Sequence, residues 1–157
     1  MSVKLVPAKP DDRYARMYFA FVEKDGGFRV ELRAEEQADA GYIDLWAADA
    51  RACKEPLRRL GGRWYVLNER KEKRKTELSD EKAVAEIEEY NAMSAEILAH
   101  RTKAWKLVNS AGEAVDVALS FETAKAVYGD EDHNLREVAQ EFLNGRANFP
   151  LRGKAAS

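Results

Sequence analysis

The sequence predicts an α+β fold: an N-terminal β-hairpin packed on helices, a long central helix, and a small C-terminal β-hairpin with two short helices. Three observations support this prediction. Apolar and polar residues alternate on either side of an Asp-Gly-Gly turn, which is typical of a hairpin. Residues 79–103 form one long charged helical pattern. Residues 105–129 combine a Trp-led strand, a glycine turn and a capped helix.

The N-terminal hairpin is the plainest local pattern, and a short strand is also predicted before it at residues 3–7. Asp25-Gly26 suits a two-residue turn, because both central positions of that turn need positive φ. A lone hairpin is marginal in water, so another element must cover its apolar face. The predicted register gives that face four apolar residues: Phe19, Phe21, Val30 and Leu32.

The segment that follows the hairpin is the expected cover, because its apolar residues recur at helical spacing. Pro56 lies inside this pattern and should kink or divide the helix. Gly61-Gly62 can end the helix through a left-handed cap, and GRWYVLNE after it is expected to be a short strand or an extended connector. The apolar residues of the predicted helix are Tyr42, Leu45, Trp46, Cys53, Leu57 and Leu60.

The central helix is predicted to begin after Ser79, which is a good N-cap. After it, the pattern predicts a strand at 106–108, a turn at 109–112 and a return strand at 115–117. The apolar stripe of the central helix comprises Val84, Ile87, Tyr90, Ser94, Ile97 or Leu98, and Trp105.

Two short helices are predicted to complete the C-terminal module. Ser120 is expected to cap the first, which stops at Gly129. Asn134 is expected to cap the second, over residues 135–143, with Glu137 three residues further on.

These patterns divide the chain into residues 1–60 (hairpin and helix), 61–77 (basic insert or loop), 78–145 (long helix and C-terminal αβ module) and 146–157 (flexible tail). The insert contains ERKEKRK, whose two glutamates favour a solvated loop or a partner-facing surface over a nucleic-acid site. The basic patch consists of Arg70, Lys71, Lys73, Arg74 and Lys75.

Composition narrows the function classes. The chain has 157 residues, enough for one ordinary domain, and its 34% charged residues exceed the average of about 25%. The net charge of −2 argues against a general nucleic-acid binder. The single cysteine, Cys53, excludes an internal disulfide and is expected to be a core thiol. The pattern contains neither a signal peptide nor an 18-residue apolar segment, which predicts a soluble protein.

The sequence contains no catalytic motif, so we expect neither an enzyme nor a cofactor. It lacks GxSxG, and its glycines match no phosphate-binding pattern. His100 is expected on the surface near the end of a helix. The carboxylates beside His133 are adjacent in sequence and would fan outward on a helix, so they favour a helix N-terminus over a metal site.

The candidate binding residues are aromatic or basic. Tryptophan is enriched at binding hot spots. In the tail, Phe149 precedes Pro150 on an extended segment. Two interpretations of that tail stay open: an end whose Phe149 folds back on the domain, or a docking peptide anchored by Phe149. The predicted partner-binding residues are Trp105, Phe142, Arg146, Phe149 and Arg152.

The order ILAHRTKAWKLVNSAGEAV followed by SFETAKAVYGDEDHNLREVAQEFLNGRANF resembles the C-terminal half of tail assembly chaperones of long-tailed bacteriophages. That pattern has a Trp after a helix, a D/N-x-x-G turn, a "t-x-E-x-a" helix, a final helix and an N-F close. The N-terminal KLVPAK and the V-x-L-R strand are also similar, whereas the insert at 61–77 has no counterpart. The corresponding residues are Trp105, Asn109, Gly112, Glu122, Ala124, Asn148 and Phe149.

The resemblance implies a non-enzymatic helper in the host cytoplasm. Such proteins bind the tape-measure protein, keep its helical, aggregation-prone chain soluble, help recruit tail-tube proteins, and leave before the tail is complete. A ribosomal frameshift gives many of them a longer form. A helical client needs an apolar groove with a charged rim, and weak self-association is compatible with this function.

The sequence leaves two alternatives open. The chain could be a structural tail or neck protein retained in the virion. It could also be a small regulator that binds protein or nucleic acid through ERKEKRK.

Overall fold

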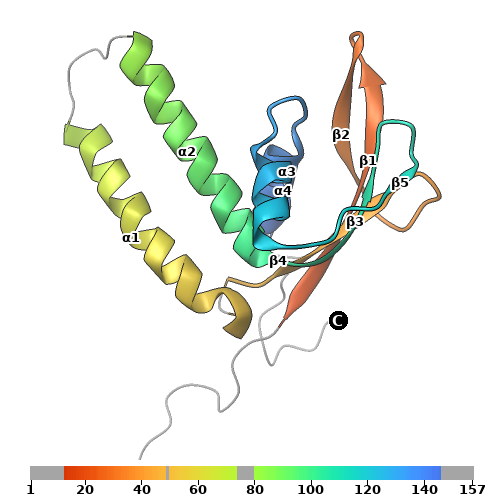
Figure 1. Cartoon of the computed structure of the whole chain (residues 1–157), viewed down its shortest axis with the longest axis horizontal. Helices are drawn as coiled ribbons and strands as arrows, with labels where there is room; N and C mark the ends of the chain where they lie inside the picture. The colour runs from red at the N-terminus through yellow and green to blue at the C-terminus, as the bar shows by residue number, and fades with distance from the viewer. Residues whose placement is uncertain (1–12, 49, 74–79, 146–157) are drawn as a thin grey trace, which may run out of the picture.

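The structure is a computed structural model that describes residues 13–48, 50–73 and 80–145 (Figure 1). Within these residues, helices pack against an antiparallel sheet with strand order β2-β1-β3-β4-β5, which confirms the predicted α+β class. The predicted strand at 3–7 and the N-cap at Ser79 lie outside the described residues. In chain order, the elements are β1 (Tyr14–Lys24), β2 (Gly27–Arg33), β3 (Gly41–Trp46), α1 (Arg51–Lys73), α2 (Asp80–Arg101), β4 (Thr102–Val108), β5 (Ala114–Val115), α3 (Phe121–Gly129) and α4 (Leu135–Asn144).

The N-terminal hairpin forms as predicted. Asp25 and Gly26 have φ values of 52° and 81°, the positive angles that this tight turn requires. Phe19 lies opposite Leu32, as the alternation predicted. Phe19 is buried, whereas Leu32, nearer the end of β2, is exposed.

The segment after the hairpin begins with a strand, so the helix predicted to include Tyr42 and Trp46 is wrong there. β3 lies between β1 and β4, with Ile43 and Leu45 fully buried. A central strand carries apolar residues on both faces, and over a few residues such a run imitates helical spacing. Gly41 has a specific role here, because a Cβ would collide with the Lys106 carbonyl oxygen of the next strand.

α1 begins later and ends later in the sequence than predicted. It is not divided at Pro56, which lies in its second turn, and it does not end at Gly61-Gly62. GRWYVLNE is therefore helical, and the 61–77 insert is helical as far as Lys73 rather than a loop. Packing outweighs the β propensity of this segment, since the Trp64 ring lies edge-on to Tyr90 of α2 at a centroid distance of 4.8 Å.

Local hydrogen bonds explain both the junction between α2 and β4 and the turn between β4 and β5. The Thr102 hydroxyl donates to the Leu98 carbonyl at 2.7 Å where α2 gives way to β4. The Asn109 side chain accepts from the amides of Ala111 and Glu113, and Gly112 has a φ of 76°, so the predicted turn is confirmed. β5 ends at Val115, so the return strand is shorter than predicted.

The caps of the last two helices differ. Ser120 accepts from the Thr123 amide, and Thr123 bonds back to the Ser120 amide, which confirms the predicted cap of α3. Asn134 occupies the predicted N-cap position of α4, but its side chain makes no cap hydrogen bond, so the expected side-chain cap is wrong. Instead, its Oδ1 accepts from the Val30 amide at 2.7 Å and its Nδ2 donates to the Val30 carbonyl at 3.2 Å. The Asn134 side chain thus satisfies the backbone N–H and C=O of Val30 on the unpaired edge of β2.

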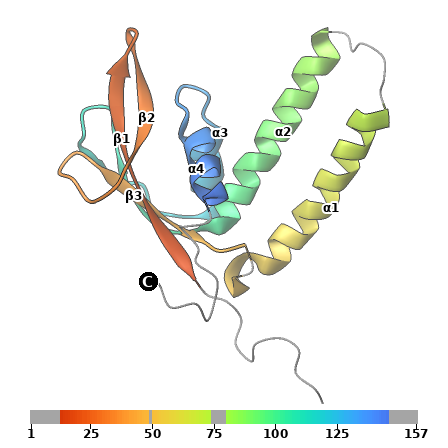
Figure 2. The same cartoon turned by 180° about the vertical axis from the view of Figure 1, so that it is seen from behind.

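The sheet, α2, α3 and α4 enclose one core, which includes Ile43, Leu45, Leu98, Tyr128 and Leu135. β3 and β4 pair within this sheet, so the predicted parts 1–60 and 78–145 share one body. Burial raises the pKa of Tyr128, whose hydroxyl bonds with that of Thr102 at 2.7 Å. α1 and α2 lie side by side and extend away from the sheet (Figures 1 and 2). We call α1 together with the N-terminal half of α2 (residues 80–91) the arm.

Candidate protein-binding groove

One stripe of α2 is buried at one end and exposed at the other. Val84, Ile87, Ala95 and Leu98 follow helical spacing and share a face. Ala95 and Leu98, near the body, are each 1% exposed. Val84 and Ile87, on the arm, are 53% and 59% exposed. The core-facing stripe therefore continues onto the surface as α2 leaves the body.

α1 adds exposed apolar residues to the same arm. Tyr65 is 69% exposed, and Trp64 and Val66 are also exposed. Three consecutive apolar residues cannot share one face of a helix, so at least one must face away from α2. Gathered exposed apolar residues on a domain commonly mark an interaction site.

A cleft of about 230 Å³ lies between α2 and the α3–α4 corner, beside the exposed stripe. Ala92 and Ala95 of α2 line its apolar side. Its rim carries both charges, from Glu88, Lys125, Glu131 and Arg136. The cleft and the exposed part of the stripe, Val84 and Ile87, together form what we call the groove.

The rim charges of the groove are held in place by the body. The Arg136 side chain is almost completely buried, donates to the Tyr128 carbonyl at 3.1 Å, and pairs with Glu131 and Glu137. Lys125 pairs with Glu96 of α2 at 3.4 Å. A fixed rim of both signs can orient a charged partner without further rearrangement.

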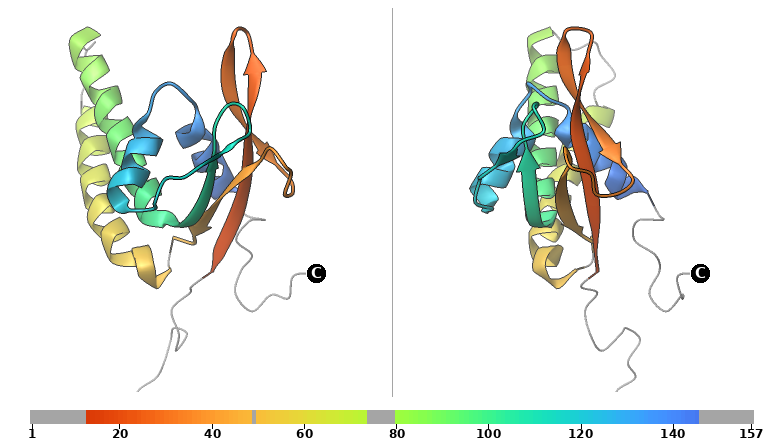
Figure 3. Two further views of the ribbon diagram at one scale, coloured as in Figure 1. Left: turned by 45° about the vertical axis from the view of Figure 1, so that its right-hand side comes forward. Right: turned by 90° about the vertical axis from the view of Figure 1, so that its right-hand side faces the viewer.

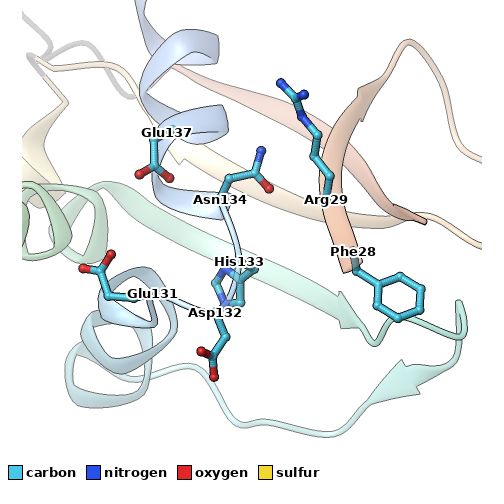
Figure 4. Close-up of a pocket in the computed structure, with 7 residues that line it drawn as sticks. All are labelled: Phe28, Arg29, Glu131, Asp132, His133, Asn134 and Glu137. Carbon is cyan, nitrogen blue, oxygen red and sulfur yellow. The ribbon is translucent and has the colours of Figure 1, made fainter. Parts of the chain in front are cut away.

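A second hollow, of about 520 Å³, lies between β2 and the α3–α4 loop (Figure 4). His133 accepts from the Leu135 amide at 3.3 Å, and its ring lies edge-on to Phe21. The described residues that line this hollow include no serine, threonine, cysteine or lysine. The contacts of His133 and Asn134 with their neighbours are those of a loop fastened to the sheet.

No cluster of three or more His, Cys, Asp or Glu residues that could hold a metal occurs in the described parts of the chain. Cys53 is buried, with its Sγ 3.4 Å from the Ala47 carbonyl oxygen. None of the described helices combines the length and apolar character needed to span a membrane.

The structure places the predicted partner-binding residues away from the groove or outside the described residues. Trp105 is partly buried in β4, and its indole Nε1 donates to the Val117 carbonyl at 2.9 Å. Phe142 is partly buried against the core. Neither contributes to the groove. Arg146, Phe149 and Arg152 lie outside the described residues.

The predicted basic patch begins on a helix. Arg70, Lys71 and Lys73 belong to α1. Arg74 and Lys75 lie outside the described residues. The patch therefore starts at the far end of the arm.

Comparisons of the chain with protein-family models, with curated proteins and with solved structures found no match.

Proposed function

We propose that the chain is a non-enzymatic tail assembly chaperone that binds helical segments of a tape-measure protein and helps recruit tail-tube proteins in the host cytoplasm. The observation that supports this function best is the α2 stripe, which leaves the core and continues, exposed, beside the cleft. The resemblance of residues 97–149 to such chaperones supports it independently.

An amphipathic helix suits the groove because its apolar side chains recur at the spacing of the α2 stripe. Val84 and Ile87 lie one helical turn apart, and the cleft can take an additional apolar side chain. Complete burial of one such side chain contributes about 1.5–3 kcal/mol. Two or three contacts of this size would hold a client firmly enough to keep it soluble, yet allow its release.

The test is co-expression with the candidate tape-measure protein, with soluble client measured in the presence and absence of this chain. We expect the chain to raise client solubility and to copurify with it. Ile87→Asp should abolish both effects with little change in melting temperature, because Ile87 is already exposed. Phe28→Asp is the matched control, since Phe28 is an exposed apolar residue of β2, outside the arm.

Failure of the client to become soluble, or equal effects of Ile87→Asp and Phe28→Asp, would contradict the proposal. A chaperone should also be absent from purified particles. If the chain is found in them instead, the virion-protein alternative replaces the chaperone. The docking-peptide hypothesis stays a prediction, in which Phe149→Ala preserves melting temperature but weakens client binding.

A further inference from the structure

The sheet has a second face, turned away from the helices. Within the described chain, all four helices lie on one side of β1–β3 (Figure 3, left). Side chains alternate along a strand, so the neighbours of the buried Met17, Phe19, Ile43 and Leu45 point to the other side. We call that side the outer face.

Four aromatic rings lie on the outer face in two edge-to-face pairs. The Tyr14 and Trp46 centroids are 6.1 Å apart, and those of Tyr18 and Tyr42 are 6.5 Å apart. Tyr14 is exposed, and the other three are half-buried. A solvent-exposed sheet face usually carries polar side chains, so four aromatic side chains across two strands are unusual.

Cations lie over three of these four rings. The Arg16 guanidinium lies 3.8 Å from the Tyr42 centroid and makes a bidentate pair with the buried Asp44 at 2.8 and 3.0 Å. The Lys103 ammonium lies 4.5 Å from the Tyr14 centroid and 5.5 Å from that of Trp46. Such contacts fix the positions of the cations and limit the side-chain entropy that a partner's binding would cost.

The outer face is basic, although the chain as a whole carries a charge of −2. Residues paired across neighbouring strands share a face. Arg33 lies opposite Tyr18, and Lys106 lies opposite Tyr42. Of the acidic residues placed there by the same register, Asp44 is paired with Arg16, and Glu31 has Arg33 at 3.5 Å. The positive charges of Lys103 and Lys106 therefore exceed those balanced by the two acidic residues.

We propose that the outer face is a second protein-binding surface, separate from the groove, and that it binds an acidic protein segment. Tyrosine, tryptophan and arginine are the residue types that dominate binding hot spots. The basic outer face complements a carboxylate-rich partner, and phenol hydroxyls, guanidinium and ammonium groups all donate hydrogen bonds to carboxylates.

Nucleic acid is the competing partner for a basic aromatic sheet face, and the geometry disfavours it. Bases bind such sheets by stacking on open ring faces. Here, Arg16 covers the Tyr42 ring, and Lys103 is shared by the Tyr14 and Trp46 rings. A base that stacked on the cation side of these three rings would displace a cation, whereas a carboxylate can bind the cations where they already lie.

The experiment is an NMR titration of the ¹⁵N-labelled full chain with a polyglutamate peptide and, separately, with a thymidine oligonucleotide of equal charge at the same salt. We expect polyglutamate to shift amides of β1, β3 and β4 and to leave those around Ile87 unchanged. Lys103→Glu should weaken binding about fivefold, the change produced by losing about 1 kcal/mol. Lys54→Glu, a charge reversal at an exposed position of α1, should leave affinity unchanged.

Lys106→Glu provides a second variant, in case Lys103→Glu disturbs the sheet through Tyr14 and Trp46. Tighter binding of the oligonucleotide than of polyglutamate would overturn the proposal in favour of nucleic acid. Binding of neither probe, or equal losses in Lys103→Glu and Lys54→Glu, would reduce the outer face to a structural element. None of these outcomes changes the test of the groove, which depends on Ile87.

Discussion

The body and the arm use apolar residues in opposite ways. In the body, Ile43, Leu45 and Tyr128 are completely buried between the sheet and the helices. On the arm, Tyr65 and Ile87 are exposed. Exposed apolar groups add little to folding stability but remain available to a partner. The comparison therefore suggests that the body supplies stability and the arm supplies binding.

The polar contacts of the body also stabilise it more than those between α1 and α2 stabilise the arm. In the body, hydrogen bonds join distant segments, as Asn134 does to Val30. α1 contacts α2 through the Trp64–Tyr90 ring pair on the arm and through the partly exposed Arg63–Glu96 ion pair closer to the body. An exposed ion pair contributes about 0–1 kcal/mol. The arm should consequently open more readily than the body.

The largest expected effect comes from truncating a core residue of the body. Leu45→Ala should lower the free energy of unfolding by about 2–5 kcal/mol, because it leaves a cavity in a fully buried site. Ile87→Ala should change it by no more than about 0.5 kcal/mol, since Ile87 is on the surface. Urea denaturation measures both values, and similar losses would break the distinction between body and arm.

The next largest effect is expected from removing the Asn134 side chain, which bonds to the edge strand β2. Asn134→Ala removes both hydrogen bonds to Val30 and should cost about 1–3 kcal/mol. Amide exchange at Val30 should accelerate, and the exposed edge of β2 should make the variant more prone to association. Asn144→Ala at the exposed end of α4 is the control. Unchanged protection of Val30 would show that Asn134 does not hold this edge.

Short-range chemistry accounts for the parts of the fold that the sequence predicted. The Asp25-Gly26 turn, the Asn109–Gly112 turn and the Ser120 cap each depend on contacts within about five residues. Propensity and local hydrogen bonding determine such features before tertiary packing forms.

Tertiary packing decides the parts that the sequence did not predict. β3 is a strand because β1 and β4 pair with it, and α1 passes Gly61-Gly62 because it packs along α2. Asn134 has the sequence position of a helix cap, yet a strand more than 100 residues away uses its amide. These three features depend on contacts between segments that are distant in the sequence, so local propensity does not predict them.

The groove was predictable in part. The stripe containing Val84 and Ile87 follows from helical spacing in the sequence. Which end of the stripe is buried does not, because that depends on where α3 and α4 pack against α2. The WYV run of α1 carried an available signal, since consecutive apolar residues on a helix must in part face solvent.

A smaller effect is expected for the cap of α3 in the body. Ser120→Ala should cost about 1 kcal/mol through loss of the α3 cap, whose Oγ accepts from the Thr123 amide at 3.1 Å. Amide exchange should accelerate in α3 but not in α1. Ser110→Ala, at an exposed position of the turn that Asn109 organises, is the matched control. An unchanged melting temperature would refute the cap assignment.

The smallest effect concerns His100, which lies in the last turn of α2, within the body. Its ring stacks on Phe121 of α3 at a centroid distance of 4.4 Å. Burial lowers the pKa of His100, the nearby Glu96 opposes that shift, and Arg59 adds to it. The folded state thus favours the neutral imidazole.

As pH falls below about 6.5, the ordinary pKa of histidine, the unfolded chain takes up this proton before the folded chain does. The stability contributed by neutral His100 is therefore complete above pH 6.5 and should decrease as the pH falls toward 5. His100→Gln should flatten this part of the stability–pH curve. Urea midpoints between pH 5 and 8 measure the slopes. An equal slope in wild type and His100→Gln would show that His100 does not contribute to the pH dependence of stability.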